Sequence, residues 1–192
     1  MNISEEITKR ASDIETRIKG FLPEQYEYQK TIVDAMSYSV LAGGKRLRPM
    51  LMEASYQMFG GEGEELDAFM AAIEMIHTYS LIHDDLPCMD DDDLRRGKPT
   101  NHKVYGETLA VLAGDAMQPE AFRIILQARG LSAENRIEAA LILARACGAD
   151  GMVAGQVLDT LCHVRDEKGL STLNRLKTGV MISAAAELGC VA

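Results

Sequence analysis

The chain has 192 residues and a mass of 21.0 kDa, which suits one domain, or one domain and a fragment, and excludes two large domains. Apolar residues make up 47% and charged residues 26%, so neither a disordered chain nor a fibrous repeat fits the composition. Aromatic residues are only 5% and tryptophan is absent, while Ala, Leu, Met, Ile and Glu are plentiful. This mixture favours helices over strands.

The net charge is −9, and nearly half of it comes from one short segment. Residues 84–96 carry six aspartates and two arginines, a local charge of −4. Because nonspecific nucleic-acid binding needs a broad basic face, a chain with an isoelectric point near 4.9 is not expected to bind nucleic acid. The concentration of acid in one segment instead suggests a local function.

Cysteine spacing and hydropathy indicate the compartment. The four cysteines form no C-x-x-C pair and no zinc-ligand spacing, so free thiols in a reducing cytosol are expected. The N-terminus MNISEEITKR has no apolar signal core, and no stretch approaches the roughly 18 apolar residues of a spanning helix. The sequence therefore predicts a soluble cytoplasmic protein without a membrane span.

Turn signals divide the chain into helix-length pieces without strand-like alternation, which predicts an all-α fold. The helix that begins near residue 64 is the most apolar, and its large apolar side chains recur at helical spacing, as in the central helix of a bundle. Pro119 is expected to kink the helix that contains it. The expected helices cover about 4–19, 24–43, 49–58, 64–84, 109–129, 133–147, 152–162 and 171–190.

The acidic segment follows this apolar helix and could hold a metal ion. Asp90 lies six positions after Asp84, a step that turns a regular helix by 600° and leaves the two side chains about 120° apart. Both can meet one ion only if the helix bulges or ends between them, and Pro87 supplies such a break. Magnesium binds through one or two carboxylates together with waters or phosphate oxygens, whereas the spacing of an EF-hand calcium loop is absent. The simpler alternative is a solvated acidic loop.

Basic residues near this segment suggest a diphosphate ligand, because arginine binds phosphate through paired hydrogen bonds. Arg95 and Arg96 follow the aspartates directly, although they could simply form salt bridges with them. The segment GGKRLRP at 43–49 places three cations on a glycine turn that leads into a helix start, where backbone N–H groups favour anions. Its simpler interpretation is a helix cap with surface charges.

Taken together, five segments resemble the trans-isoprenyl diphosphate synthases, specifically the bacterial short-chain farnesyl and geranylgeranyl members. They are GGKRLRP, the Asp-Asp-x-x-x-x-Asp motif with its trailing RRGKPT, LAGDAM, GMVAGQVLD and LKTG. The resemblance implies an all-α isoprenoid-synthase bundle around a central cavity, a homodimer, and magnesium-dependent transfer of an allylic group to isopentenyl diphosphate. A class I terpene cyclase shares the fold and an aspartate-rich motif but lacks the isopentenyl site, so the pairing of GGKRLRP with RRG favours the synthase.

The resemblance also implies roles for individual residues. Asp84 and Asp90 would hold magnesium; Arg95, Lys177 and Thr178 would contact the allylic diphosphate; Lys45, Arg48, His77 and Arg96 would bind isopentenyl diphosphate. The residues four and five positions before Asp84, Ser80 and Tyr79, would limit product length, and the ring of Tyr79 predicts a stop at farnesyl diphosphate.

The family carries a second aspartate-rich motif on a later helix, and no aspartate follows Lys177 here. Residues 1–192 are therefore expected to form the N-terminal two thirds of a single polyprenyl synthetase domain, without the C-terminal third. Geranylgeranyl diphosphate synthesis remains an alternative. So does a truncated, noncatalytic fragment that binds diphosphates or regulates a partner.

Overall fold

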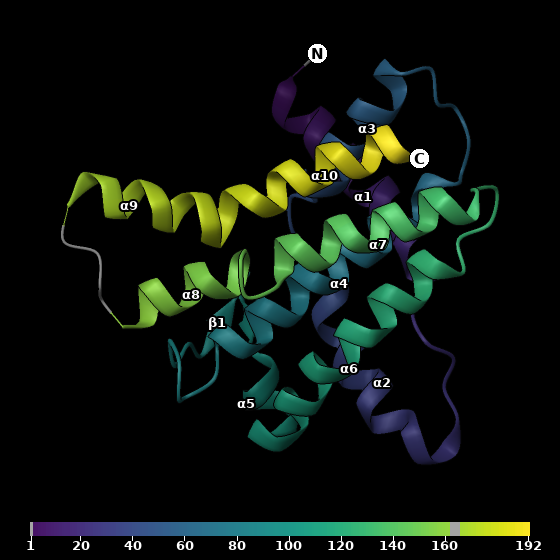
Figure 1. Ribbon diagram of the computed structural model, residues 1–192. Helices are drawn as coiled ribbons and strands as arrows, with labels where there is room; N and C mark the ends of the chain where they lie inside the picture. The colour runs from purple at the N-terminus through teal and green to yellow at the C-terminus, as the bar shows by residue number, and fades with distance from the viewer. Residues whose placement is uncertain (1, 162–165) are drawn as a thin grey trace. The chain divides into compact units, whose positions relative to one another are not determined.

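A computed structural model describes residues 2–161 and 166–192, which fold almost entirely into helices (Figure 1). The helices belong to two compact units. The first unit contains Met1–Leu47 and Met70–Ile124, and the second contains Arg48–Phe69 and Ile125–Ala192. The predicted all-α class is confirmed.

The first unit carries the N-terminal helices and the acidic segment. Within it, α5 lies against α2, where the Asn101 side-chain amide donates to the carbonyl of Ala35 at 2.8 Å. The Tyr38 hydroxyl donates to the carbonyl of Pro99, also at 2.8 Å. Its elements are α1 (Ile3–Lys19), η1 (Glu27–Gln29), α2 (Lys30–Val40), most of α4 (Leu66–Asp84), β1 (Leu94–Arg95), β2 (Lys98–Pro99), α5 (Asn101–Tyr105) and most of α6 (Glu107–Leu126).

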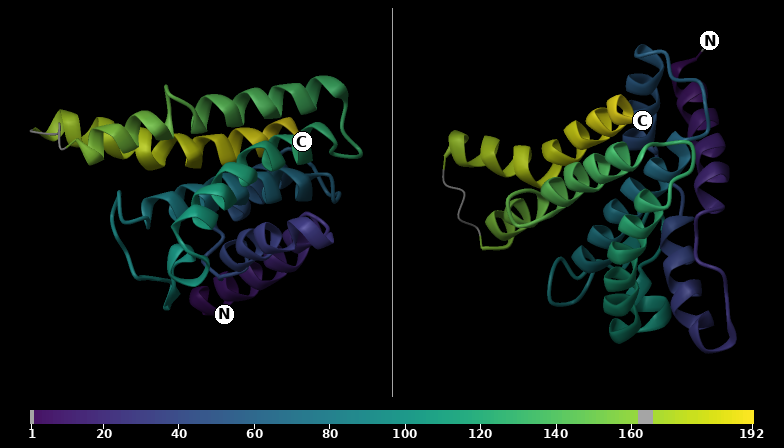
Figure 2. Two further views of the ribbon diagram at one scale, coloured as in Figure 1. Left: turned by 90° about the horizontal axis from the view of Figure 1, so that it is seen from below. Right: turned by 45° about the vertical axis from the view of Figure 1, so that its right-hand side comes forward.

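In the second unit α10 runs along α7, as Figure 2 shows in both views. Gly189 of α10 lies against α3, because a Cβ atom at this position would be 2.2 Å from the carbonyl oxygen of Met52. The elements are α3 (Leu47–Met58), α7 (Ala133–Cys147), α8 (Met152–Thr160), α9 (Glu167–Asn174), the π-helical turn η2 (Arg175–Gly179) and α10 (Val180–Val191).

Several helices begin at capping side chains, which accept hydrogen bonds from backbone N–H groups that the first turn leaves without helical partners. The Asn2 side chain accepts from the amide of Ser4 at the start of α1. Ser132 caps α7 in the same way, and Asp166 caps α9. The α7 bounds, Ala133–Cys147, are those that the sequence predicts.

Helix α4 is buried along most of its length, as its apolar composition predicts. Large side chains from successive turns, including Phe69, Ile73 and Ile76, have no exposed surface. A helix that is apolar on every side must be covered on every side, and its polar residues are therefore held in fixed surroundings. The acidic segment extends from the C-terminal end of this buried rod.

The structure differs from the predicted elements at several points. The helix predicted over 24–43 is the shorter α2, Lys30–Val40, which follows the 3₁₀ turn η1. A two-strand antiparallel hairpin, in which Leu94 pairs with Pro99, and the short helix α5 were not expected; each is too brief to produce a periodic signal. The last predicted helix begins four residues earlier, at Glu167, and contains a π-helical turn. Helix α6 is unbroken at Pro119, and the kink expected there stays a prediction.

The helix predicted over 152–162 ends at Thr160, and Cys162 lies outside the described residues. The other three cysteines are free thiols, as predicted, with Cys88 and Cys190 exposed and Cys147 buried. Burial raises the pKa of the Cys147 thiol. In the described ranges, no helix has the length and apolar character needed to cross a membrane.

Candidate functional site

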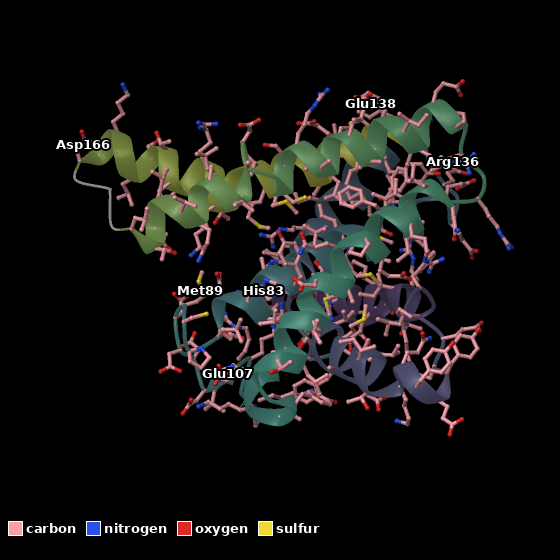
Figure 3. The ribbon with its side chains drawn as sticks, turned by 60° about the horizontal axis from the view of Figure 1, so that its bottom comes forward. His83, Met89, Glu107, Arg136, Glu138 and Asp166 are labelled. Carbon is pink, nitrogen blue, oxygen red and sulfur yellow. The ribbon has the colours of Figure 1, made fainter. Side chains whose placement is uncertain are left out.

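The loop after α4 brings the main chains of Asp84 and Asp90 together. The helix ends at Asp84, and the chain turns back so that the Asp90 amide donates to the Asp84 carbonyl at 2.8 Å. The amides of Met89 and Asp91 both donate to the carbonyl of Leu86, which closes the turn around Pro87. Figure 3 labels His83 on the helix and Met89 in this loop. The break that the spacing of the two aspartates requires is therefore present.

The carboxylates of this loop differ in exposure. Asp84 is half-buried, and Asp90, Asp91, Asp92 and Asp93 are exposed. Among residues 2–161 and 166–192, no group of three or more His, Cys, Asp or Glu side chains could hold a metal by itself. A pair of carboxylates fits a magnesium site that is completed by water and phosphate oxygens, which is the usual form for that ion.

Arg95 lies against the aspartates. The Nε atom of its guanidinium donates to the Asp85 carboxylate at 2.7 Å. A terminal nitrogen also donates to that carboxylate, and the same nitrogen donates to Asp92 at 3.2 Å. Burial raises the pKa of the Asp85 carboxyl, and Arg95 opposes that rise. The hydrogen bond to Asp85 raises the pKa of Arg95 in turn. The salt bridges that the sequence left open as an alternative role for Arg95 are thus formed.

A tight hairpin turn places Arg96. Arg96 and Gly97 have φ angles of 53° and 77°, and both are positive, as the two central residues of a type I′ turn require. The Thr100 amide donates to the Asp93 carbonyl at 3.0 Å, and its hydroxyl to the Asp92 carbonyl at 2.8 Å. These hydrogen bonds from Thr100 of RRGKPT fix the C-terminal end of the acidic loop at Asp92 and Asp93.

The glycine turn and the hairpin meet through Arg96. One terminal nitrogen of Arg96 donates to the carbonyl of Gly43. A Cβ atom on Gly44, whose φ is 125°, would lie 2.6 Å from the guanidinium carbon of Arg96, so only glycine allows this approach. Burial and the nearby charge of Arg46 lower the pKa of Arg96. The Gly43–Arg96 hydrogen bond thus joins GGKRLRP to RRG. The two bonded residues are 53 positions apart in the sequence.

Arg46, in the middle of the glycine turn, points inward, a role that sequence reasoning missed. Its side chain is fully buried, and its two terminal nitrogens lie 2.6 Å from Glu74 and 2.7 Å from Glu15. Burial lowers the pKa of Arg46, but the two glutamates outweigh it and the net shift is upward. Glu74 was the available signal, because a carboxylate within an apolar helix requires a cationic partner.

Lys45 is exposed in the glycine turn, and helix α4 carries three more predicted residues of the first unit, His77, Tyr79 and Ser80. His77 is half-buried, and the Ser80 hydroxyl donates to its carbonyl at 2.9 Å. Tyr79 is buried with its ring edge-on to His83, the centroids being 5.7 Å apart. A Cβ on Gly114, in the segment LAGDAM, would lie 2.2 Å from the His83 ring, so this glycine allows α6 to approach α4.

Three predicted site residues belong to the second unit: Arg48, Lys177 and Thr178. Arg48 is half-buried near the start of α3, and Lys177 and Thr178 lie in the π-helical turn. The Lys177 ammonium lies 2.5 Å from the Asp159 carboxylate on α8. A Cβ on Gly155 would lie 2.2 Å from the Lys177 backbone nitrogen, so this glycine of GMVAGQVLD allows the two segments to touch. π-helical turns occur frequently at functional sites.

Comparison with known proteins identifies similar chains. The polyprenyl synthetase family model matches residues 29–192. A farnesyl diphosphate synthase from Haemophilus influenzae is 44% identical over 190 residues, which are 96% of this chain and 64% of that protein. A chloroplastic geranylgeranyl pyrophosphate synthase from Capsicum annuum is 49% identical over 164 residues, 83% of this chain and 44% of that protein.

A crystal structure of an FPP/GFPP synthase from Zymomonas mobilis superimposes with a TM-score of 0.91 at 40% identity, covering 98% of this chain and 69% of that one. The chain thus spans between 44% and 64% of the two curated relatives described above. Because the family match extends over most of the sequence and includes the acidic loop, the hairpin and the π-helical turn, the chain belongs to the polyprenyl synthetase family.

Proposed function

We propose that the protein condenses isopentenyl diphosphate with an allylic diphosphate, dimethylallyl or geranyl, to give farnesyl diphosphate. The proposal rests mainly on one observation, that carboxylates and cationic side chains come together in the first unit. The loop closed by the Asp84–Asp90 hydrogen bond presents carboxylates for a divalent ion, and the Arg96–Gly43 contact beside it presents cations for diphosphate.

Asp84 and Asp90 would hold magnesium. The ion would supply positive charge to the departing diphosphate of the allylic substrate. Asp84 lies at the end of a buried helix, and the main-chain bond fixes the backbone of Asp90 next to that of Asp84, which would help both to serve as ligands.

The residues expected to bind substrate would divide between the two diphosphates. Arg95, Lys177 and Thr178 would bind the allylic diphosphate, and Lys45, Arg48, His77 and Arg96 would bind that of isopentenyl diphosphate. Charge neutralisation at the first diphosphate favours heterolysis of the allylic C–O bond, in which the electron pair leaves with the diphosphate. The isopentenyl double bond then attacks the allylic cation, a C–C bond forms, and a proton is lost to the released diphosphate.

Tyr79 and Ser80 would set product length. Tyr79 is a large ring on α4, five residues before Asp84, and its edge-on contact with His83 fixes its orientation. A fixed ring beside a growing chain limits the number of isoprene units, which favours a fifteen-carbon product. The 49% identity to the geranylgeranyl pyrophosphate synthase from Capsicum annuum supports a twenty-carbon product as the second candidate.

We also propose that residues 1–192 belong to a single polyprenyl synthetase domain that acts as a homodimer in the cytoplasm. The fraction of each relative that the chain spans supports one further candidate, a noncatalytic fragment that binds diphosphates or regulates a partner.

The test is incubation with isopentenyl diphosphate, geranyl diphosphate and magnesium, followed by chromatography of the products. It uses the 192-residue chain and a form extended to the length of the relatives, each with an Asp84→Asn control. Farnesyl diphosphate from either form, lost in its control, is the expected result. If neither form makes a product although both bind geranyl diphosphate, the noncatalytic candidate is correct.

A further inference from the structure

Arg46 is a cation buried inside the first unit. Its side chain has no exposed surface, and Glu74, its partner on α4, is 2% exposed. The other partner, Glu15 on α1, is about one-third exposed. A third hydrogen bond joins Arg46 to the carbonyl of Val40 at the end of α2 at 2.5 Å. One guanidinium thus holds together α1, α2, α4 and the glycine turn.

The backbone of the turn is bent to make these contacts. Arg46 has a φ of 49°, in the left-handed region that side-chain-bearing residues rarely adopt. Such a conformation persists where the surrounding contacts determine it, and it is common at functional sites. The bend separates two neighbouring cations, since Lys45 is exposed while Arg46 is buried.

The residues on either side of Arg46 are those expected to bind substrate. Lys45 directly precedes it, and Gly43 and Gly44 hold the guanidinium of Arg96. Glu74 lies on α4 three residues before His77, about one helical turn away. The Arg46–Glu74 ion pair therefore fixes the glycine turn to the helix that carries His77, and with it the spacing of Lys45, Arg96 and His77.

We propose that Arg46 is a positioning residue, which holds Lys45 and Arg96 in register with His77 for the diphosphate of isopentenyl diphosphate. This inference rests on the proposed function of these three residues. Arg46 itself does not touch the ligand, because both of its terminal nitrogens are directed to Glu74, Glu15 and Val40.

The experiment uses three changes in the chain extended to the length of its relatives. Arg46→Met/Glu74→Met removes both charges together, which is tolerated far better than leaving one buried charge unpaired. Arg46→Lys keeps the charge and loses the forked geometry. Lys45→Met removes an expected ligand from the exposed side of the same turn. Circular dichroism and thermal unfolding show whether each variant is folded.

The expected result is a KM for isopentenyl diphosphate raised about tenfold or more in the double variant, with the KM for geranyl diphosphate changed less than about twofold, because only one subsite loses its geometry. Arg46→Lys should recover part of the loss. Adding Lys45→Met to the double variant should weaken binding little further, since the two changes act on one unit. Equal changes in both KM values, or no change in either, would show that Arg46 serves stability alone.

A binding measurement separates this proposal from the prenyltransferase proposal. Calorimetric titration with inorganic diphosphate, without added magnesium, reports on the cationic side chains whether or not the protein is an enzyme. The double variant should bind at least about tenfold more weakly than the unsubstituted chain, as Lys45→Met should. If Lys45→Met weakens binding and the double variant does not, Arg46 has no positioning role, even if the protein makes farnesyl diphosphate.

Discussion

The backbone amide of Asp90 donates a hydrogen bond, at 2.8 Å, to the carbonyl of Asp84, six positions earlier in the chain. In a continuous helix, the spacing of the two aspartates would keep them from meeting one ion. The bond returns the chain to Asp84 and so allows both aspartates to serve one site. Because α4 ends at Asp84 and is buried over most of its length, the bond also anchors Asp90 to the end of a buried helix.

Gly44→Ala should weaken isopentenyl diphosphate binding through Arg96. An added Cβ would displace the guanidinium, which lies 2.6 Å away, and the positive φ of 125° adds a conformational cost of about 1–3 kcal/mol. The matched control is Gly106→Ala, whose φ of 86° carries similar strain but whose Cβ would meet nothing within 4 Å, and which makes no contact with Arg96. Urea unfolding and substrate kinetics separate the effects: both variants lose stability, and only Gly44→Ala raises the KM. Equal KM values would contradict the role of Arg96.

Gly155→Ala should destabilise the second unit. The new Cβ would lie 2.2 Å from the backbone nitrogen of Lys177, and backbone cannot swing aside as a flexible side chain can. We expect the free energy of unfolding, measured with urea, to fall by about 1–3 kcal/mol, the usual cost of overpacking. Gly179→Ala is the control, because its Cβ would make only an ordinary contact of 3.6 Å and its backbone is helical. A similar loss in both variants would mean that the close approach of α8 is unimportant.

Tyr79→Ala should lengthen the product from fifteen to twenty carbons by removing the buried ring. Truncation of a large buried side chain costs about 3–5 kcal/mol, so Tyr79→Leu provides a better-packed second variant. Tyr79→Phe keeps the ring and should keep the fifteen-carbon product. Product chain length by mass spectrometry decides the question. Folded Ala and Leu variants whose longest product remains fifteen carbons would show that Tyr79 does not limit chain growth.

The pattern of apolar residues was enough to predict the helices that are buried in the structure. The all-round apolar pattern identifies α4, and the predicted bounds of α7 agree with the structure. The hairpin at Leu94–Arg95 could not be predicted in this way, because two residues are too few for any period. It is held by a type I′ turn at Arg96–Gly97 and by Thr100, which are contacts of individual residues.

The site was predicted unevenly for a related reason. The aspartates and arginines are visible as a charge pattern, and the pairing of Arg95 with Asp85 was among the alternatives that the pattern allows. Lys45 and Arg46, in contrast, are neighbouring cations with opposite orientations, and sequence spacing does not distinguish them. Only the left-handed backbone at Arg46 and its partner Glu74, 28 residues away, decide which cation faces inward.

The central claim is that Asp84 and Asp90 together provide a magnesium site for an allylic diphosphate. Calorimetric titration of geranyl diphosphate into the chain, with and without magnesium, tests it directly, with Asp84→Asn and Asp90→Asn as variants and the exposed Asp91→Asn as control.

Loss of groups outside the coordination sphere already costs about 10–100-fold in metal affinity. We therefore predict that each of the two variants loses at least about a hundredfold of the magnesium-dependent affinity, while Asp91→Asn keeps it. Magnesium-dependent binding that survives in both Asp84→Asn and Asp90→Asn would contradict the claim.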